Sequence, residues 1–178
     1  VAGALGGDIG ITTPFYPAAD LYGDAYTLYG SLPDGGDSAG EAELPEPFFT
    51  NTVFYTQALA VPQRRNWTNA DVIRGKALFA SVSCNKCHIP QMTTGDFPQI
   101  PLLSNQIIHP YTDLLLHDMG ADLADGRPDY LATGSEWRTP PLWGIGLVST
   151  VNNNNGMFLM HDGRARTIEE AILLQDRK

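Results

Sequence analysis

Apolar residues recur at helical spacing in two short stretches of the chain. The first stretch opens with Thr68 and Asp71, which have the form of a capping box and so mark the start of a helix. The residues that follow on one face, at intervals of three, four and three, are Val72, Gly75, Phe79 and Val82. This spacing is typical of an amphipathic helix. A glycine on such a face would let a second helix approach closely.

The second stretch lies near the end of the chain. Thr167 and Glu170 repeat the capping-box pattern. The residues that then share one face are Ile168, Ala171, Ile172 and Gln175. Two further short helices are predicted, one over residues 48–59, which Pro62 ends, and one near residues 111–116.

The sequence between these helices is rich in loop-forming residues. The 178 residues include 18 Gly and 13 Pro, which exclude a regular helical bundle and predict long ordered loops. Residues 1–47 show neither a helical period nor strand alternation, and residues 31–37 read as a turn. We expect 1–47 to be an extended segment packed on a surface and 48–178 to be the main domain. The aromatic residues that argue against a free linker are Tyr16, Tyr22, Tyr26 and Tyr29.

Charge and hydropathy narrow the possible partners. Eleven Lys and Arg oppose 20 Asp and Glu, so the net charge is −9. This acidic balance argues against nucleic acid or an anionic membrane surface as the main partner. No run of residues approaches the ~20 apolar positions of a membrane span.

The candidate chemistry is concentrated in one motif, Cys84-Asn85-Lys86-Cys87-His88, which directly follows the first helix and holds both cysteines of the chain. Cys-x-x-Cys-His is the attachment signature of c-type haem. Two thiols one turn apart can bond to the two vinyl groups on one edge of the porphyrin, and the adjacent histidine can ligate the iron. The motif therefore predicts one covalent haem c on Cys84 and Cys87, with His88 as an iron ligand.

Two other interpretations of the motif are less favoured. A thioredoxin-like redox pair is expected between a strand and a helix, whereas here the motif follows a helix. A zinc site needs two more ligands. The remaining histidines, His109, His117 and His161, are distant in sequence.

A helix leading into the haem motif, wrapping loops and a final helix describe a class I cytochrome c. We therefore expect a mainly α fold with long loops, of the class I cytochrome c-like type. In this interpretation the last helix crosses the first at Gly75, with Ala171 as a small partner.

Several blocks of sequence resemble the C-terminal haem domain of bacterial di-haem oxidoreductases, the group of di-haem thiol oxidoreductases and peroxidases related to the di-haem cytochrome c peroxidases. In chain order the blocks read RGKALF, CNKCH, YTDLLLHDMG, EWRTPPLWG and HDGRARTIEEAI. The stretch GDIGIT at residues 7–12 resembles the segment that joins the two haem domains of that family. The resemblance implies a haem oxidoreductase.

The resemblance also implies a partner and further site residues. The family carries two haem motifs and this chain has one, which implies a second haem domain or a redox protein as partner. His117 and His161 become haem-pocket residues, although a histidine followed by Asp is more often an ordinary loop residue. Arg138 and Arg164 could pair with the haem propionates, since a guanidinium binds a carboxylate bidentately; surface salt bridges are the alternative.

The sixth iron ligand is the least determined feature. Met119 is the first choice, because it lies within a block shared with the relatives. Met160 is the second, since a class I cytochrome takes a methionine from the loop before its last helix. An open site, or one capped by Gln175, is the third. Simple packing of Met119 against the porphyrin is the alternative to ligation.

These features predict an electron-transfer module with one haem, part of a larger multi-haem protein or complex. The alternatives are a peroxidase-type oxidoreductase with an open iron site and a structural haem subunit of an assembly. Because Cys-x-x-Cys-His is joined to haem outside the bacterial cytoplasm, the motif predicts a periplasmic or exported protein.

Overall fold

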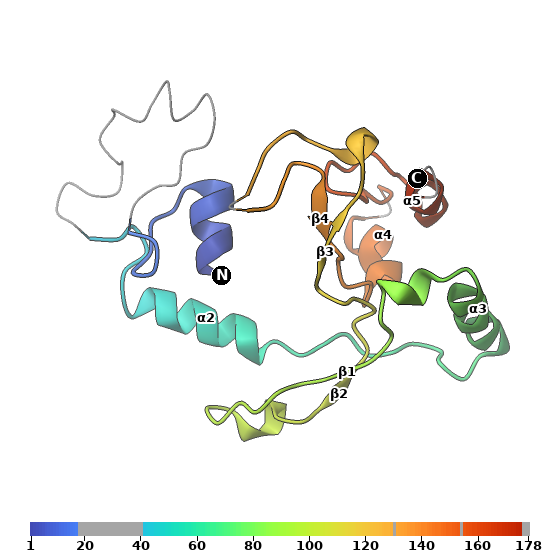
Figure 1. Cartoon of the computed structure of the whole chain (residues 1–178). Coiled ribbons are helices and arrows are strands. Elements are labelled where there is room, and N and C mark those ends of the chain that lie inside the picture. The colour runs from blue at the N-terminus through green and yellow to red at the C-terminus, as the bar shows by residue number, and fades with distance from the viewer. Residues whose placement is uncertain (18–40, 130, 154, 176–178) are drawn as a thin grey trace. The chain divides into compact units, whose positions relative to one another are not determined.

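The structure is a computed structural model, which describes residues 1–17, 41–129, 131–153 and 155–175 (Figure 1). It divides into two compact units, Val1–Ala60 and Val61–Lys178. The expected turn at 31–37 lies outside the described residues, as do three of the tyrosines that argue against a free linker, Tyr22, Tyr26 and Tyr29.

The first unit contains the π-helix η1 (Ala4–Asp8) and the α-helix α2 (Phe48–Ala58). The predicted helix at 48–59 is thus confirmed. Thr12 is buried, and its backbone N–H donates to the Glu43 carboxylate at 2.9 Å while its hydroxyl accepts from the Glu43 N–H at 2.9 Å. These bonds connect the start of the chain to the segment that leads into α2.

The second unit holds the remaining elements, most of them short. Its α-helices are α3 (Ala70–Ser81), α4 (Val148–Val151) and α5 (Ile168–Gln175). Its 3₁₀ turns are η2 (Cys84–Lys86), η3 (Pro101–Leu103), η4 (Ala121–Leu123) and η5 (Ile145–Leu147).

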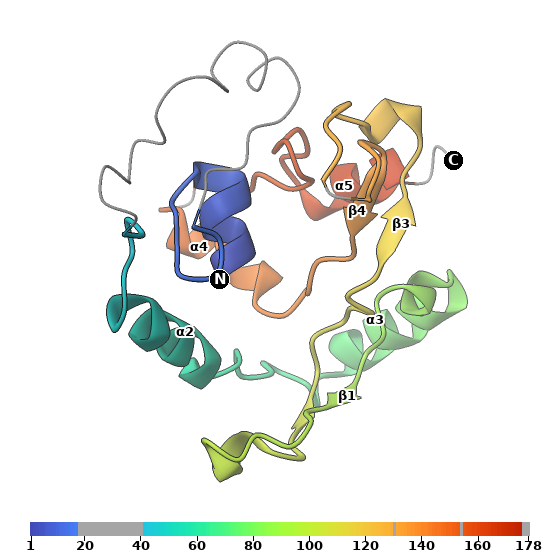
Figure 2. The ribbon, with the colours of Figure 1, turned by 60° about the vertical axis from the view of Figure 1, so that its left-hand side comes forward.

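Two small antiparallel sheets join the loops of the second unit. β1 (Met92–Thr93) pairs with β2 (Ile107–Ile108), and β3 (Leu116–Asp118) pairs with β4 (Glu136–Arg138). In the second sheet His117 lies opposite Trp137, and the two strands run side by side in both views (Figure 1, Figure 2). A loop region without helical period satisfies its backbone groups through these ladders.

The expected mainly α, class I cytochrome c-like fold is therefore wrong. Helix accounts for 37% of the described residues and strand for 9%. The expected helix crossing is not seen either, because a Cβ at Gly75 would meet no atom within 4 Å. The apolar faces that should have met are exposed, with Val72 at 44% and Ile172 at 56%.

Helix α3 confirms the first predicted helix but corrects its cap. The Asn69 side chain accepts hydrogen bonds from the N–H groups of Asp71 and Val72, at 2.8 and 3.4 Å. Asn69, one residue beyond Thr68, is therefore the N-cap. For α5 the predicted cap is confirmed, since the Glu170 N–H donates to the Thr167 hydroxyl at 3.0 Å.

The predicted helix at 111–116 is wrong. Tyr111 and Leu114 have positive φ values of 55° and 60°, which a right-handed helix excludes. The side chains of Thr112 and Asp113 accept the backbone N–H groups of Leu114 and Leu115, at 2.8 and 2.9 Å. Such local bonds compete with helix formation, so this segment is a turn that leads into β3.

Candidate cofactor-binding site

The Cys-x-x-Cys-His motif forms a tight turn at the end of α3. Ser83, in the left-handed region with φ 66°, separates α3 from η2, which begins at Cys84. The backbone N–H of His88 donates to the Cys84 carbonyl at 2.9 Å. Both cysteines are half-buried free thiols. The turn therefore carries two thiols and an imidazole on one short segment.

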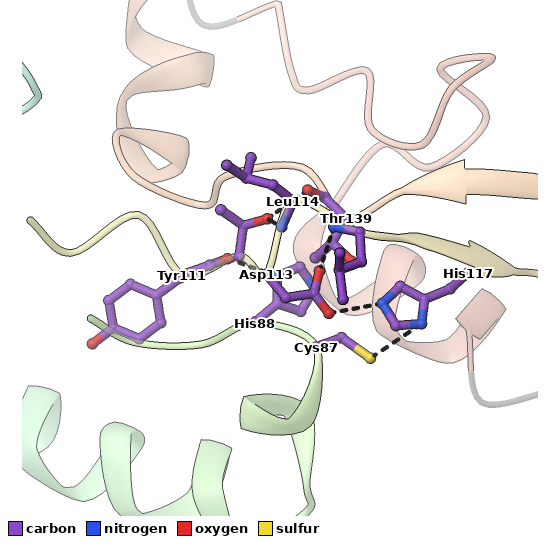
Figure 3. A network of polar contacts seen from close by, with 9 residues as sticks. Cys87, His88, Tyr111, Asp113, Leu114, His117 and Thr139 are labelled. Carbon is purple, nitrogen blue, oxygen red and sulfur yellow. Dashed lines mark hydrogen bonds and ion pairs between the residues drawn. The ribbon is translucent and has the colours of Figure 1, made fainter. Parts of the chain in front are cut away.

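The His88 ring is oriented by a backbone carbonyl. Its Nδ1 lies 2.8 Å from the carbonyl oxygen of Tyr111 (Figure 3). A carbonyl only accepts hydrogen bonds, so Nδ1 carries the proton and Nε2 of the neutral ring keeps its lone pair. Histidines that bind metals are typically oriented in this way, by a hydrogen-bond acceptor on the nitrogen that does not touch the metal. The arrangement suits His88 to hold an iron through Nε2.

An aromatic cluster packs beside this histidine. The Phe79 ring centroid lies 6.2 Å from that of His88 and 5.7 Å from that of Tyr111, with the Tyr111 ring edge-on. Phe79 comes from α3 and Tyr111 from the turn before β3. The cluster thus joins the helix to the turn that orients His88.

A buried threonine holds that turn in place. Thr112 is fully buried, and its hydroxyl donates to the Thr139 carbonyl at 2.6 Å while accepting from the Leu114 N–H at 2.8 Å. The Thr139 N–H in turn donates to the Leu115 carbonyl at 2.9 Å. The turn is thereby bonded to the segment that follows β4.

The same turn presents an Asp–His pair to Cys87. Asp113 Oδ2 lies 2.8 Å from His117 Nε2, and His117 Nδ1 lies 3.9 Å from Cys87 Sγ (Figure 3). The Asp113 side chain is 6% exposed and that of His117 is 34% exposed. The structure therefore brings His117 beside the motif, across 30 residues of sequence.

The Asp113 carboxylate is strongly held in its ionised form. Burial acts to raise its pKa, but hydrogen bonds from the Leu115 N–H, His117 and the Thr139 side chain outweigh this effect and lower the pKa from 3.8 to about 2. Sequence reasoning missed Asp113. The Asp-x-x-x-His spacing is the available signal, but Asp113 falls within the helix predicted near residues 111–116.

The cluster also bears on the zinc interpretation. The ligand atoms of Cys87, Asp113 and His117 lie within 4.8 Å of one another. However, Asp113 is bonded to the far nitrogen of the imidazole, so only the sulfur and Nδ1 face each other. Two donors fall short of the four that a structural zinc site takes.

The other predicted residues lie in separate places. Arg138 is exposed on β4. Arg164 donates to the Asp162 carboxylate at 2.6 Å and to the Asp122 carbonyl at 2.9 Å. Burial acts to raise the pKa of Asp162, but the contact of its carboxylate with Arg164 outweighs this effect and lowers the pKa. A propionate role for either arginine stays a prediction.

The candidates for the sixth ligand are also distributed. Met119 is half-buried in the turn after β3, where its N–H donates to the Ser135 carbonyl at 2.8 Å. Met160 and Gln175 lie together, with 4.0 Å between the Met160 sulfur and the Gln175 amide nitrogen. His161 stacks on Trp137 with ring centroids 3.8 Å apart.

The apolar surface around the motif fits a large apolar cofactor. Among the described residues of the second unit, few apolar side chains are buried, namely Pro110, Leu123 and Ala165. Apolar side chains next to the motif and in the turn beside it are 38–69% exposed, namely Val82, Ile89, Leu114, Leu115 and Leu116. A porphyrin could cover such a surface and add to the small apolar core of the described residues in this unit.

Paired thiols, an oriented imidazole and an uncovered apolar surface are the features by which a haem-type protein could hold its cofactor. A family model described as "Di-haem oxidoreductase, putative peroxidase" matches residues 1–177, and the chain belongs to this family. The resemblance noted in the sequence is thereby confirmed. No curated protein and no solved structure matches the chain.

The family description and the sequence differ in one respect. The description names two haems, whereas both cysteines of this chain lie in one attachment motif.

Among the described residues, no helix is both long enough and apolar enough to cross a bilayer.

Proposed function

We propose that the chain holds one covalent haem c and passes single electrons to a second redox centre. Cys84 and Cys87 would form the two thioethers, and His88 would be the axial ligand. The observation that carries the proposal is the 2.8 Å contact between His88 Nδ1 and the Tyr111 carbonyl, which leaves Nε2 available for iron. When bound, the haem supplies one-electron chemistry.

The chain's own residues give this site its stability. The Tyr111 carbonyl fixes the tautomer and direction of His88, and Phe79 supports both rings. The bonds of Thr112 hold the turn that carries that carbonyl. A ligand held so firmly changes little when the charge on the metal changes, which suits electron transfer.

The second redox centre is supported by the family. Its description names two haems, and this chain offers one attachment motif. We also propose an exported or periplasmic location, because this type of haem attachment takes place outside the bacterial cytoplasm. Fractionation of cells that express the native gene tests the location.

Peroxidase-type chemistry is the second candidate, favoured by the family description. It requires an open iron position, whereas an electron carrier has two axial ligands. A low-spin ferric spectrum that cyanide and peroxide leave unchanged would support the carrier. A high-spin ferric spectrum that responds to both would overturn it in favour of the enzyme.

Haem attachment is tested first on the intact protein. Extraction with acidified acetone should leave the haem on the polypeptide, and the intact mass should equal the chain plus one haem. Freely extracted haem, or zinc in its place, would contradict the proposal. Replacing both Cys84 and Cys87 by Ala is the matched control, which should release any haem on extraction.

A further inference from the structure

The contacts among Asp113, His117 and Cys87 determine which nitrogen of the His117 ring carries the proton. The Asp113 carboxylate is ionised and only accepts hydrogen bonds, so His117 Nε2, 2.8 Å away, carries the ring proton. In the neutral imidazole, Nδ1 then holds a lone pair, and it faces the Cys87 sulfur at 3.9 Å (Figure 3). A thiol next to such a lone pair is placed to give up its proton. This order of carboxylate, imidazole and nucleophile is the one that activates nucleophiles in enzymes.

We propose that His117 accepts the thiol proton of Cys87 when this cysteine forms its thioether, and that Asp113 positions His117 for this step. The inference rests on the proposed function, since it assumes that Cys87 is a haem-attachment residue. His117 touches the reacting sulfur and is the catalytic residue. Asp113 acts through His117 and is the positioning residue.

The step is an addition and balances without an oxidant or reductant. Cys87 transfers its proton to His117 Nδ1, and the sulfur bonds to the vinyl carbon nearer the porphyrin ring. The π bond of the vinyl group breaks, and the terminal carbon takes up one proton, so that S–H has added across C=C. His117 returns to its neutral form by releasing the proton it accepted.

The assistance is specific to one of the two cysteines. Among the residues that the structure describes, Cys84 makes no side-chain hydrogen bond, whereas Cys87 has His117. Proton transfer by a positioned side chain contributes about 10²–10⁴-fold to a rate. Loss of His117 should therefore slow thioether formation at Cys87 and leave Cys84 unaffected.

The test is to express full-length variants with a c-type haem attachment system and to count thioethers on each chain. A retained vinyl group moves the pyridine haemochrome band to longer wavelength, and peptide mass spectrometry shows which cysteine is free. In His117→Gln we expect thioether formation at Cys87 to be at least about tenfold slower, so that chains attached only through Cys84 accumulate. Cys87→Ala supplies the spectrum of that species.

The role of Asp113 is tested by attachment at Cys87 in two variants, which differ in whether they keep a carboxylate. Asp113→Asn should also accumulate chains attached only through Cys84, whereas Asp113→Glu, which keeps a carboxylate for Nε2, should restore attachment at Cys87. His109→Gln is the matched control, because His109 bonds a backbone carbonyl, that of Pro90 at 3.1 Å, and should attach haem as the wild type does.

Two results would overturn the inference. The first is complete double attachment in His117→Gln at the wild-type rate. The second is an equal loss at Cys84 and Cys87, because the argument concerns Cys87 alone. Failure of the proposed function is a different result, since the wild-type protein itself would then carry no covalent haem.

Discussion

Replacing Thr112 by Val tests whether one buried hydroxyl holds the turn that orients the site. The substitution keeps the shape of the side chain and removes two hydrogen bonds, one to the Thr139 carbonyl at 2.6 Å and one from the Leu114 N–H at 2.8 Å. Thr139 is 6% exposed, so its carbonyl loses a partner that water cannot replace. Leu114 is 50% exposed, so water can partly reach its N–H.

The expected cost follows from these two positions. An unsatisfied buried group costs about 1–3 kcal/mol, and a lost hydrogen bond near water costs about 1 kcal/mol. Thr112→Val should therefore lower the free energy of unfolding by about 2–4 kcal/mol. Thr112→Ser, which keeps the hydroxyl, should lose much less. Thr150→Val, a change at an exposed helical position, should change the stability by no more than about 0.5 kcal/mol.

Urea unfolding followed by tryptophan fluorescence suits the measurement. Trp67, Trp137 and Trp143 all lie in the second unit, so the signal reports on the unit that holds Thr112. A Thr112→Val protein within about 0.5 kcal/mol of wild type, or no less stable than Thr150→Val, would refute the reasoning. It would show that the turn is held by other contacts, and that His88 does not depend on this hydroxyl for its orientation.

Three further predictions concern acid stability, the sixth ligand and a glycine. The pKa of Asp113 in the folded protein, about 2, is below its ordinary value of 3.8. The stability from the ionised carboxylate is therefore present above pH 3.8 and is lost as the pH falls toward 2. The urea midpoints of wild type and Asp113→Asn should differ at pH 6 and converge between pH 3.8 and 2, and a constant difference would contradict this assignment. Met119→Ala should abolish the long-wavelength sulfur-to-iron charge-transfer band of the ferric protein if Met119 is the sixth ligand, and an unchanged spectrum removes it as a candidate. Gly163→Ala should cost about 1–2 kcal/mol in urea unfolding, because Gly163 has φ +71° and an added Cβ would lie 3.4 Å from Phe158; Gly95→Ala, in open space at an ordinary φ, is the control, and equal stability of the two variants would argue against strain at Gly163.

Features that depend on neighbouring residues were accessible from the sequence. The helices at Ala70–Ser81 and Ile168–Gln175 follow from periodicity and caps, and for the helix at Phe48–Ala58 the sequence marks the end through Pro62. The attachment motif is a matter of spacing, and the ordered blocks of residues identify the family, which the match over 1–177 confirms. Even here the predicted cap of the helix at Ala70–Ser81 is wrong by one residue, because Thr68 and Asn69 are both good cap residues and only the backbone distinguishes them.

The tertiary structure decided the contacts that orient the site. The Tyr111 carbonyl meets His88 across 23 residues, and His117 meets Cys87 across 30. Neither contact has a local signature, since each requires the chain to leave the helical region at Tyr111 and Leu114. The helix predicted near residues 111–116 is incompatible with both contacts. The side chains of Thr112 and Asp113 bond the nearby backbone, and the pairing of β3 with β4 then places His117. These interactions together outweigh the local preference for a helix, so the two contacts are seen only in the folded chain.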